Sequence, residues 1–286
     1  WYQRRVRGMS LIKYTRAKTL TTREQYTEEA QQQYFGSTNM HPSYFFKQLK
    51  NNKPPTLPGD PQSKTHVDHI HQQHGTTTLG FVFKEGIILS VDSRSTMGGY
   101  ISSGNVKKVI PITNKILATL AGGAADCEYW DRNLARLCNE FEYQNGKEIG
   151  VTAAAQQYAS IINNYKGHGM SIGAMLAGYD IDGKPRLFYC DDGGDKQEGF
   201  LFSVGSGATF AISILETGYK FDMTTEEAID LGLKAVMYAA HRDAMSGGMQ
   251  NVWLITKDGW KLMKRQDNYE TYREVFGGEP LPRSII

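Results

Sequence analysis

One short segment combines the residue types of an N-terminal nucleophile. Gly75 is followed by three threonines, Thr76, Thr77 and Thr78, which open a β-rich run that ends at Phe83. A threonine hydroxyl is a weak nucleophile unless a base lies beside it, and an N-terminal threonine can use its own α-amine. That amine titrates near ~7.7–8.0 and is therefore partly neutral at physiological pH. Cleavage of the Gly75–Thr76 bond would make Thr76 both nucleophile and base, although threonine-rich strand starts are also common where no such chemistry occurs.

Two kinds of ionisable residue downstream could set the electrostatics around such a threonine. Asp92 follows a predicted strand over residues 87–91, a place where an acid also commonly just forms a turn. Lys107 and Lys108 lie in a predicted strand from Val106 to Ile110. Adjacent strand residues point to opposite faces, so one of the two lysines must look inward unless this is a solvated edge strand.

A glycine-rich turn offers a third chemical feature. Gly122 and Gly123 come directly before Ala124-Ala125-Asp126 and a predicted helix. The free N–H groups of a helix start can hold an anion or a developing oxyanion. The helix itself shows one apolar stripe, made by Trp130, Leu134, Leu137, Cys138 and Phe141.

Four histidines in the first quarter of the chain could in principle ligate a metal. They are His66, His69, His71 and His74. No cysteine or ordered carboxylate pattern accompanies them, so we predict no metal site.

Composition is that of an ordinary globular protein. The 286 residues are 40% hydrophobic and 22% charged, with a formal net charge of +2, which favours neither nucleic acid nor a membrane as partner. No apolar run reaches the ~18 residues that span a bilayer. Cys127, Cys138 and Cys190 form no disulfide framework, which favours a reducing compartment.

The first 75 residues differ from the rest. Residues 1–23 carry seven Lys or Arg and no acid, which is typical of a transit peptide or, as we prefer, of a basic pro-segment. Residues 24–75 are rich in Gln, Asn, Lys and Pro and predict an extended segment that folds only against a partner. Because the chain opens on Trp1, we expect it to be cut from something longer.

The body predicts antiparallel groups of strands separated by pairs of helices. The economical packing is two sheets face to face with a helix layer outside each. Strands are predicted over residues 77–83, 87–91, 106–110, 116–121, 170–179, 186–190, 200–204, 252–256 and 260–263. Helices are predicted after residue 123 and over 151–165, 208–217, a segment from 224 with a capping box, and 269–276.

Taken together, these residues resemble proteasome core-particle β-type subunits, and most closely the eukaryotic chymotrypsin-like type. The resemblance covers essentially all of residues 76–286, with the motifs in the same order. The motifs are Gly75-Thr76-Thr77-Thr78, Val91-Asp92-Ser93-Arg94, Val106-Lys107-Lys108, Ala121-Gly122-Gly123-Ala124-Ala125-Asp126, Val204-Gly205-Ser206-Gly207 and His241-Arg242-Asp243-Ala244-Met245-Ser246-Gly247-Gly248.

The resemblance implies an α/β (α+β) protein, a four-layer αββα sandwich with the N-terminal-nucleophile hydrolase fold. It implies that residues 1–75 are a propeptide removed by autocatalysis at Gly75–Thr76, and that residues 76–286 are the hydrolase domain. Thr76 would then attack the scissile carbonyl of a peptide, with no cofactor. Asp92 and Lys108 match the pair that sets the electrostatics, and Gly122 matches the oxyanion donor. The supporting polar cluster would be Ser206, Asp243 and Ser246.

The same resemblance predicts the pocket for the residue before the cut. Its lining would be Ser95, Thr96, Val106, Leu120, Ala124 and Cys127. None of these is acidic, so a preference for large apolar residues is expected. Leu120 stands where the family's chymotrypsin-like type has Met, and Ser95 stands where Ala is expected, so the pocket shape should differ.

Partners follow from the resemblance as well. It implies other α- and β-type subunits in stacked heteroheptameric rings, assembly chaperones in the precursor state, unfolded polypeptide as substrate, and a cytoplasmic and nuclear location. With residues 1–75 attached, Thr76 has no free amine, so the chain would be an uncleaved precursor in an assembly intermediate. A non-catalytic ring scaffold and an amidohydrolase for small amides are the alternatives, and the intact Thr76, Asp92 and Lys108 disfavour the scaffold.

Overall fold

The structure is a computed structural model that describes residues 75–97 and 99–277. Within these residues the chain forms two five-stranded sheets, and every pairing in them is antiparallel. The first sheet has the strand order β10-β1-β2-β11-β12. Its strands are β1 (Thr78–Phe83), β2 (Gly86–Val91), β10 (Leu201–Val204), β11 (Met249–Thr256) and β12 (Gly259–Asp267).

The second sheet has the order β5-β6-β7-β8-β9. Its strands are β5 (Val109–Pro111), β6 (Ile116–Gly122), β7 (Ile172–Tyr179), β8 (Pro185–Asp191) and β9 (Lys196–Gly199). A separate two-stranded hairpin, β3 (Ser95–Met97) with β4 (Tyr100–Ser103), extends from the end of β2.

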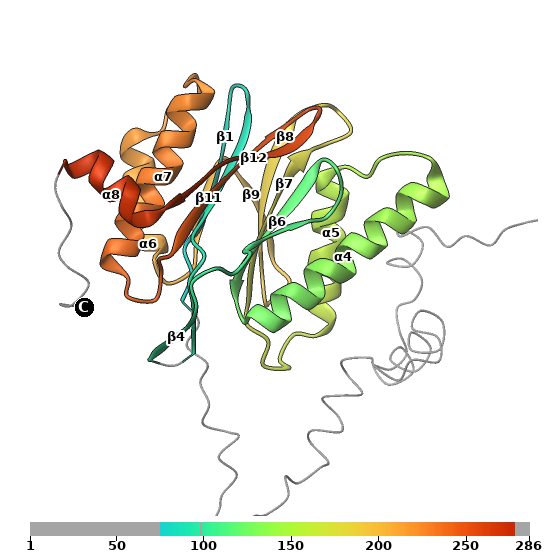
Figure 1. The fold of residues 1–286 in the computed structure, drawn as a ribbon. Coiled ribbons are helices and arrows are strands. Elements are labelled where there is room, and N and C mark those ends of the chain that lie inside the picture. The colour runs from blue at the N-terminus through green and yellow to red at the C-terminus, as the bar shows by residue number, and fades with distance from the viewer. Residues whose placement is uncertain (1–74, 98, 278–286) are drawn as a thin grey trace, which may run out of the picture. The chain divides into compact units, whose positions relative to one another are not determined.

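Helices cover the outer sides of the two sheets. Figure 1 shows α4 and α5 beside the second sheet and α6, α7 and α8 on the side of the first. The helices are α4 (Ala124–Asn145), α5 (Val151–Asn164), α6 (Ala208–Gly218), α7 (Thr225–Arg242) and α8 (Asn268–Phe276). The described body is therefore a mixed α/β fold, as expected from the sequence.

Local sequence signals explain where the helices begin and end. The predicted capping box is confirmed, because Thr224 and Glu227 bond reciprocally at the start of α7. Helix α4 ends at Gly146, whose φ of 61° lies in the left-handed region that favours glycine. The end of α7 matters for the site, since Asp243 follows directly as its C-cap residue.

Two apolar clusters hold the layers together. One lies between the sheets and contains Val82, Leu89, Leu117, Met175 and Leu187 among others. The other lies between the first sheet and helices α6 and α7. Full burial of one such aliphatic side chain contributes about 1.5–3 kcal/mol. Both clusters include residues of β1, so the strand that begins just after Thr76 is held rigidly on both faces.

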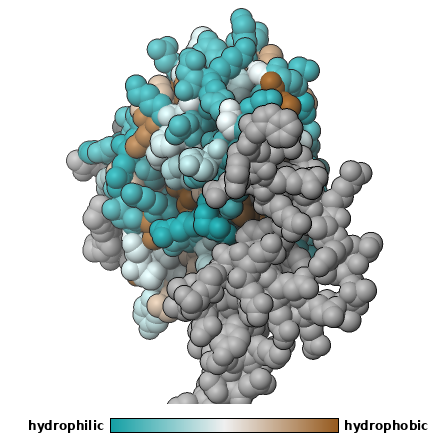
Figure 2. All heavy atoms as spheres, turned by 90° about the vertical axis from the view of Figure 1, so that its right-hand side faces the viewer, coloured by the Kyte–Doolittle hydropathy of each residue, from teal (hydrophilic) through white to brown (hydrophobic). Residues whose placement is uncertain are grey.

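The described face of the molecule in Figure 2 is largely polar. In the part of the view that Figure 2 leaves uncovered, the surface is mainly hydrophilic with small apolar areas. No helix among residues 75–97 and 99–277 is both long and apolar enough to cross a bilayer.

Helix α4 carries a buried acid on its inner face. Asp131 is fully buried, and neither of its carboxylate oxygens has a hydrogen-bond partner within the described part of the chain. Burial raises the pKa of Asp131 from its ordinary 3.8 to about 8, and interaction with the Tyr158 hydroxyl offsets this only in part. The carboxyl group is therefore neutral near pH 7.

This burial predicts a pH-dependent stability. Between about pH 4 and pH 8 the folded chain keeps a proton on Asp131 that the unfolded chain has lost, so stability falls as pH rises through this window. We expect Asp131→Asn to remove this slope, so that its free energy of unfolding exceeds that of the unmodified chain increasingly from about pH 5 to about pH 8, by a few kcal/mol at the upper end. Thermal unfolding at several pH values measures it.

The exposed Asp230→Asn is the matched control, because it removes an acid without changing a buried group. Parallel pH profiles for the unmodified chain and Asp131→Asn would contradict the assignment of the slope to Asp131.

Candidate active site

The structure holds the Gly75–Thr76 bond in a cleft at the start of β1. Thr76 is only 6% exposed, and its hydroxyl donates a hydrogen bond to the Gly75 carbonyl oxygen over 2.7 Å. The peptide N–H of Thr76 donates to Ser206 Oγ over 3.2 Å. The Thr76 hydroxyl therefore lies next to the carbonyl group that joins it to Gly75, and its nitrogen lies next to a serine.

Lys108 reaches the same carbonyl from the other side. Its Nζ lies 3.4 Å from the Gly75 oxygen and 2.6 Å from Asp92 Oδ1. Both ionisable side chains are buried, at 4% and 1% exposed. Burial lowers the pKa of the Lys108 ammonium from its usual value, while the Asp92 charge acts in the opposite direction. Lys108 is thus the inward lysine and Lys107 is exposed, but both precede β5, so the predicted strand from Val106 was wrong at its start.

Asp92 joins several segments at once. Its Oδ1 accepts the N–H of Thr77 over 3.0 Å in addition to Lys108, and its Oδ2 accepts the N–H groups of Arg94 and Gly247 over 3.2 and 3.0 Å. These contacts satisfy a buried carboxylate that would otherwise be costly. They fix the start of β1, the end of β2 and the loop after α7 around one charge.

A second polar cluster lies at the nitrogen of Thr76. Asp243 Oδ2 accepts hydrogen bonds from Ser206 Oγ and from Ser246 Oγ, each over 2.6 Å. Ser246 Oγ also lies 2.7 Å from the hydroxyl of Thr77. The structure therefore brings the three predicted supporting residues together, with Ser206 in direct contact with Thr76. Such a chain of hydroxyls ending on a carboxylate can hold or relay a proton.

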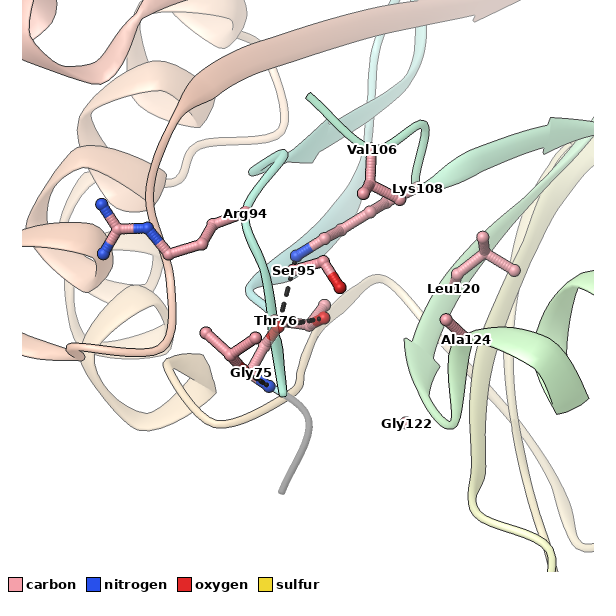
Figure 3. Close-up of a pocket in the computed structure, with 10 residues that line it drawn as sticks. Gly75, Thr76, Arg94, Ser95, Val106, Lys108, Leu120, Gly122 and Ala124 are labelled. Carbon is pink, nitrogen blue, oxygen red and sulfur yellow. Dashed lines mark hydrogen bonds between the residues drawn. The ribbon is translucent and has the colours of Figure 1, made fainter. Parts of the chain in front are cut away.

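The pocket beside Thr76 has mostly apolar walls. It is lined by Gly75, Thr76, Arg94, Ser95, Thr96, Val106, Lys108, Leu120, Gly122 and Ala124. Figure 3 shows Leu120, Ala124 and Gly122 on one side and Thr76, Ser95 and Lys108 on the other. Cys127, which the sequence also assigned to the lining, is fully buried in α4, where its thiol donates to the Ala121 carbonyl. It backs the wall and does not line the pocket.

Gly122 lies where β6 gives way to α4. Its φ of 110° is in the left-handed region, and a Cβ there would lie 2.5 Å from the Ser171 carbonyl oxygen. Only glycine fits this bend without strain. The bend brings the first backbone groups of α4 to the pocket, the location required of an oxyanion donor.

Sequence reasoning missed three residues that shape this site. Arg94 lines the pocket, but in Figure 3 its guanidinium points away from Lys108, and it donates to the Ala244 carbonyl. Thr77 and Gly247 bind Asp92 through their backbones. All three residues belong to motifs of the family resemblance, which was the available signal, although no local pattern reports a contact such as that of Gly247 with Asp92, 155 residues apart.

The four histidines considered as metal ligands lie outside the described residues. Among residues 75–97 and 99–277, no group of three or more His, Cys, Asp or Glu side chains is arranged to hold a metal.

The buried pair of Asp92 and Lys108 predicts a large stability effect. Asp92→Asn leaves the Lys108 ammonium without its counter-charge in a site that is 4% exposed, and breaking such a buried pair costs about 3–5 kcal/mol. Denaturant unfolding measures the loss. Glu148→Gln is the control, because it breaks the exposed pair with Lys115 and should cost no more than ~1 kcal/mol. Equal losses of unfolding free energy in the two variants would contradict the claim that the buried pair of Asp92 and Lys108 contributes more to stability than an exposed pair.

Comparison with known proteins identifies the family. The family model "Proteasome subunit" matches residues 72–255. A proteasome subunit beta type-5 of Dictyostelium discoideum is 47% identical over 80% of this chain and 85% of that protein. A beta type-5 subunit of Spinacia oleracea is also 47% identical, over 71% of this chain and 75% of its own length. A human beta type-8 subunit is 41% identical over 80% and 78% of the two chains. This chain belongs to the proteasome subunit family, which implies assembly with other proteasome subunits.

Proposed function

We propose that this chain is a threonine-type endopeptidase subunit of the proteasome core particle, with Thr76 as its nucleophile. The observation that carries the proposal is the position of the Thr76 hydroxyl, 2.7 Å from the Gly75 carbonyl oxygen, with the Lys108 ammonium 3.4 Å from the same oxygen. A hydroxyl and a cation beside one carbonyl are what an acyl transfer to Thr76 requires. The similarity to beta type-5 and type-8 subunits supports the same assignment.

The proposed chemistry begins with the chain itself. Thr76 Oγ attacks the Gly75 carbonyl carbon, and the Lys108 ammonium stabilises the oxyanion that forms. The C–N bond to Thr76 then breaks, an ester forms, and the hydroxyl proton ends on the Thr76 amine. Water hydrolyses the ester to a Gly75 carboxylate and restores the hydroxyl. Residues 1–75 are, in this proposal, a propeptide, and the chain that carries them is an inactive precursor.

In the mature subunit the same groups would act on peptides. The free Thr76 amine takes the proton from its own hydroxyl, and the cluster of Ser206, Asp243 and Ser246 orients that amine. Asp92 fixes Lys108, and the N–H of Gly122 stabilises the tetrahedral oxyanion. In this assignment the two helix-covered sheets are the four-layer αββα sandwich of an N-terminal-nucleophile hydrolase, and the partners are the other α- and β-type subunits, with assembly chaperones before cleavage.

The pocket supports cleavage after large apolar residues. Leu120 and Val106 supply apolar walls, and no acidic residue lines the pocket. A cationic side chain would therefore be desolvated there without a partner, next to the Lys108 ammonium.

Removal of the Thr76 hydroxyl tests the nucleophile. We expect Thr76→Ala to abolish both the cut at Gly75–Thr76 and peptide hydrolysis, because no acyl acceptor remains. Thr76→Ser should retain part of each, since it keeps the hydroxyl. Intact mass and N-terminal sequencing of the chain from assembled particles report the cut, and fluorogenic peptides report turnover.

Thr78→Ser is the matched control, because Thr78 belongs to the same threonine run but donates its hydroxyl to the Val204 carbonyl. An unmodified chain that stays joined at Gly75–Thr76 in complete particles would instead favour a scaffold subunit.

A single acid at the pocket mouth tests the specificity. Ala124 lines the pocket, is exposed, and begins α4, where an acid is compatible with the helix dipole. We expect Ala124→Glu to raise cleavage after Arg relative to cleavage after Leu by about fivefold, which corresponds to one exposed charge contact of ~1 kcal/mol.

Matched peptide substrates that differ only at the residue before the cut measure this ratio. Ala125→Glu is the control, because Ala125 is exposed at the same helix start but does not line the pocket. An unmodified subunit that prefers Arg over Leu would contradict the apolar assignment.

A further inference from the structure

We propose that Thr96 is a positioning residue for self-cleavage, because its side-chain hydroxyl fixes the glycine whose carbonyl Thr76 attacks. The inference rests on the proposed function. It concerns the side chain of Thr96 and the uncleaved chain, and it assigns this residue a task before any peptide substrate has entered.

Both polar backbone groups of Gly75, its N–H and its carbonyl oxygen, are held by hydrogen bonds. Its N–H donates a hydrogen bond to Thr96 Oγ1 over 3.1 Å, and this bond is buried. Its carbonyl oxygen lies 2.7 Å from the Thr76 hydroxyl and 3.4 Å from Lys108 Nζ. The two contacts at the oxygen belong to the reacting groups themselves. The contact at the nitrogen comes from a residue that takes no part in the bond changes.

Position 75 must be glycine, and a glycine backbone needs a restraint from a neighbouring residue. A Cβ on Gly75 would lie 1.9 Å from the Cβ of Met245 and 2.6 Å from its carbonyl oxygen, so any side chain would displace the loop after α7. Glycine has the greatest backbone freedom of any residue. Nothing intrinsic to Gly75 therefore keeps its carbonyl carbon turned toward Thr76 Oγ, and the restraint has to come from a neighbour.

The hairpin that carries Thr96 is shaped to supply this restraint. A register shift separates Ser95 and Thr96 in the pairing of β3 with β4, and such bulges re-aim side chains near active sites. Thr96 is 5% exposed, whereas its neighbour Met97 is 63% exposed and Tyr100 on the paired strand is 84% exposed. An otherwise exposed hairpin thus turns one hydroxyl inward onto Gly75.

The step that Thr96 assists is the acyl shift described above. The bond from Thr76 Oγ to the Gly75 carbon forms, the C–N bond breaks, and the hydroxyl proton passes to the departing Thr76 nitrogen. Thr96 exchanges no proton or electron pair in this step. Its contribution is orientation, which is effective when the reacting atoms are already within about 3–3.5 Å of each other.

The test replaces the hydroxyl and keeps the shape. In the full-length chain within assembled particles, pulse labelling follows the appearance of the product that begins at Thr76. We expect Thr96→Val to slow this cut about tenfold, the effect of losing one buried hydrogen bond that orients the reacting group. Thr96→Ser, which restores the acceptor, should return the rate to within about twofold of the unmodified chain.

Thr119→Val is the matched control. Thr119 is also fully buried, and its hydroxyl accepts a backbone N–H, that of Met175, over 3.2 Å. The Thr119→Val variant therefore loses the same kind of hydrogen bond at a place away from Gly75. Its rate of cutting should stay within about twofold of that of the unmodified chain. Thermal midpoints of the particles identify any general loss of folding in either valine variant.

The outcomes separate the two proposals. Normal cutting in Thr96→Val, or equal slowing in Thr119→Val, would overturn the role of Thr96 while the proposed function stands. A Thr96→Ser chain as slow as Thr96→Val would also overturn it, because the acceptor would then not matter. An unmodified chain that is never cut would overturn the proposed function and this inference together.

Discussion

The buried carboxylate of Asp92 is the contact on which the rest of the site depends. It binds the Lys108 ammonium and three backbone N–H groups, from segments that are up to 155 residues apart in the sequence. Desolvating two charges is expensive, and the pair is tolerated because nearly every lone pair of Asp92 is engaged. The same arrangement holds the Lys108 ammonium at the Gly75 carbonyl oxygen. The ion pair with Asp92 that stabilises the fold therefore also positions the ammonium for the proposed chemistry.

The threonines at the start of β1 also depend on glycines supplied from far along the chain. A Cβ on Gly205 would lie 2.0 Å from the Thr76 carbonyl oxygen, and one on Gly207 would lie 2.0 Å from Thr77 Oγ1. This close approach lets the loop before α6 bring Ser206 to the Thr76 nitrogen. Crowding therefore requires this loop to leave out two side chains so that Ser206 can be placed between them.

The sequence predicted those parts of the fold that local signals determine. The hairpin of β1 and β2, helix α5 and the capped start of α7 lie where periodicity and capping residues placed them. It did not predict β9 or the hairpin of β3 and β4, because strands of three or four largely exposed residues carry no strong periodic pattern. Residue type and place made Thr76, Asp92, Lys108 and Gly122 candidates, whereas their roles and the other site residues came from the family resemblance. Their contacts join residues far apart in sequence, which no local pattern reports.

The proposed chemistry explains how one set of residues can remain inactive until the chain is cut. While Gly75 is attached, the nitrogen of Thr76 is an amide whose lone pair is delocalised, so it cannot serve as the base. Ser206, Asp243 and Ser246 are nevertheless already arranged around that nitrogen. Cutting changes the chemistry of one atom and requires no rearrangement of the groups that hold it. The carbonyl between Thr76 and Lys108 is then replaced by that of a substrate, which meets the same hydroxyl and the same ammonium. On this reasoning, Gly75 restrains activity through its covalent bond to Thr76 and through its place in the cleft, and the described residues around Thr76 already hold the groups that both reactions use.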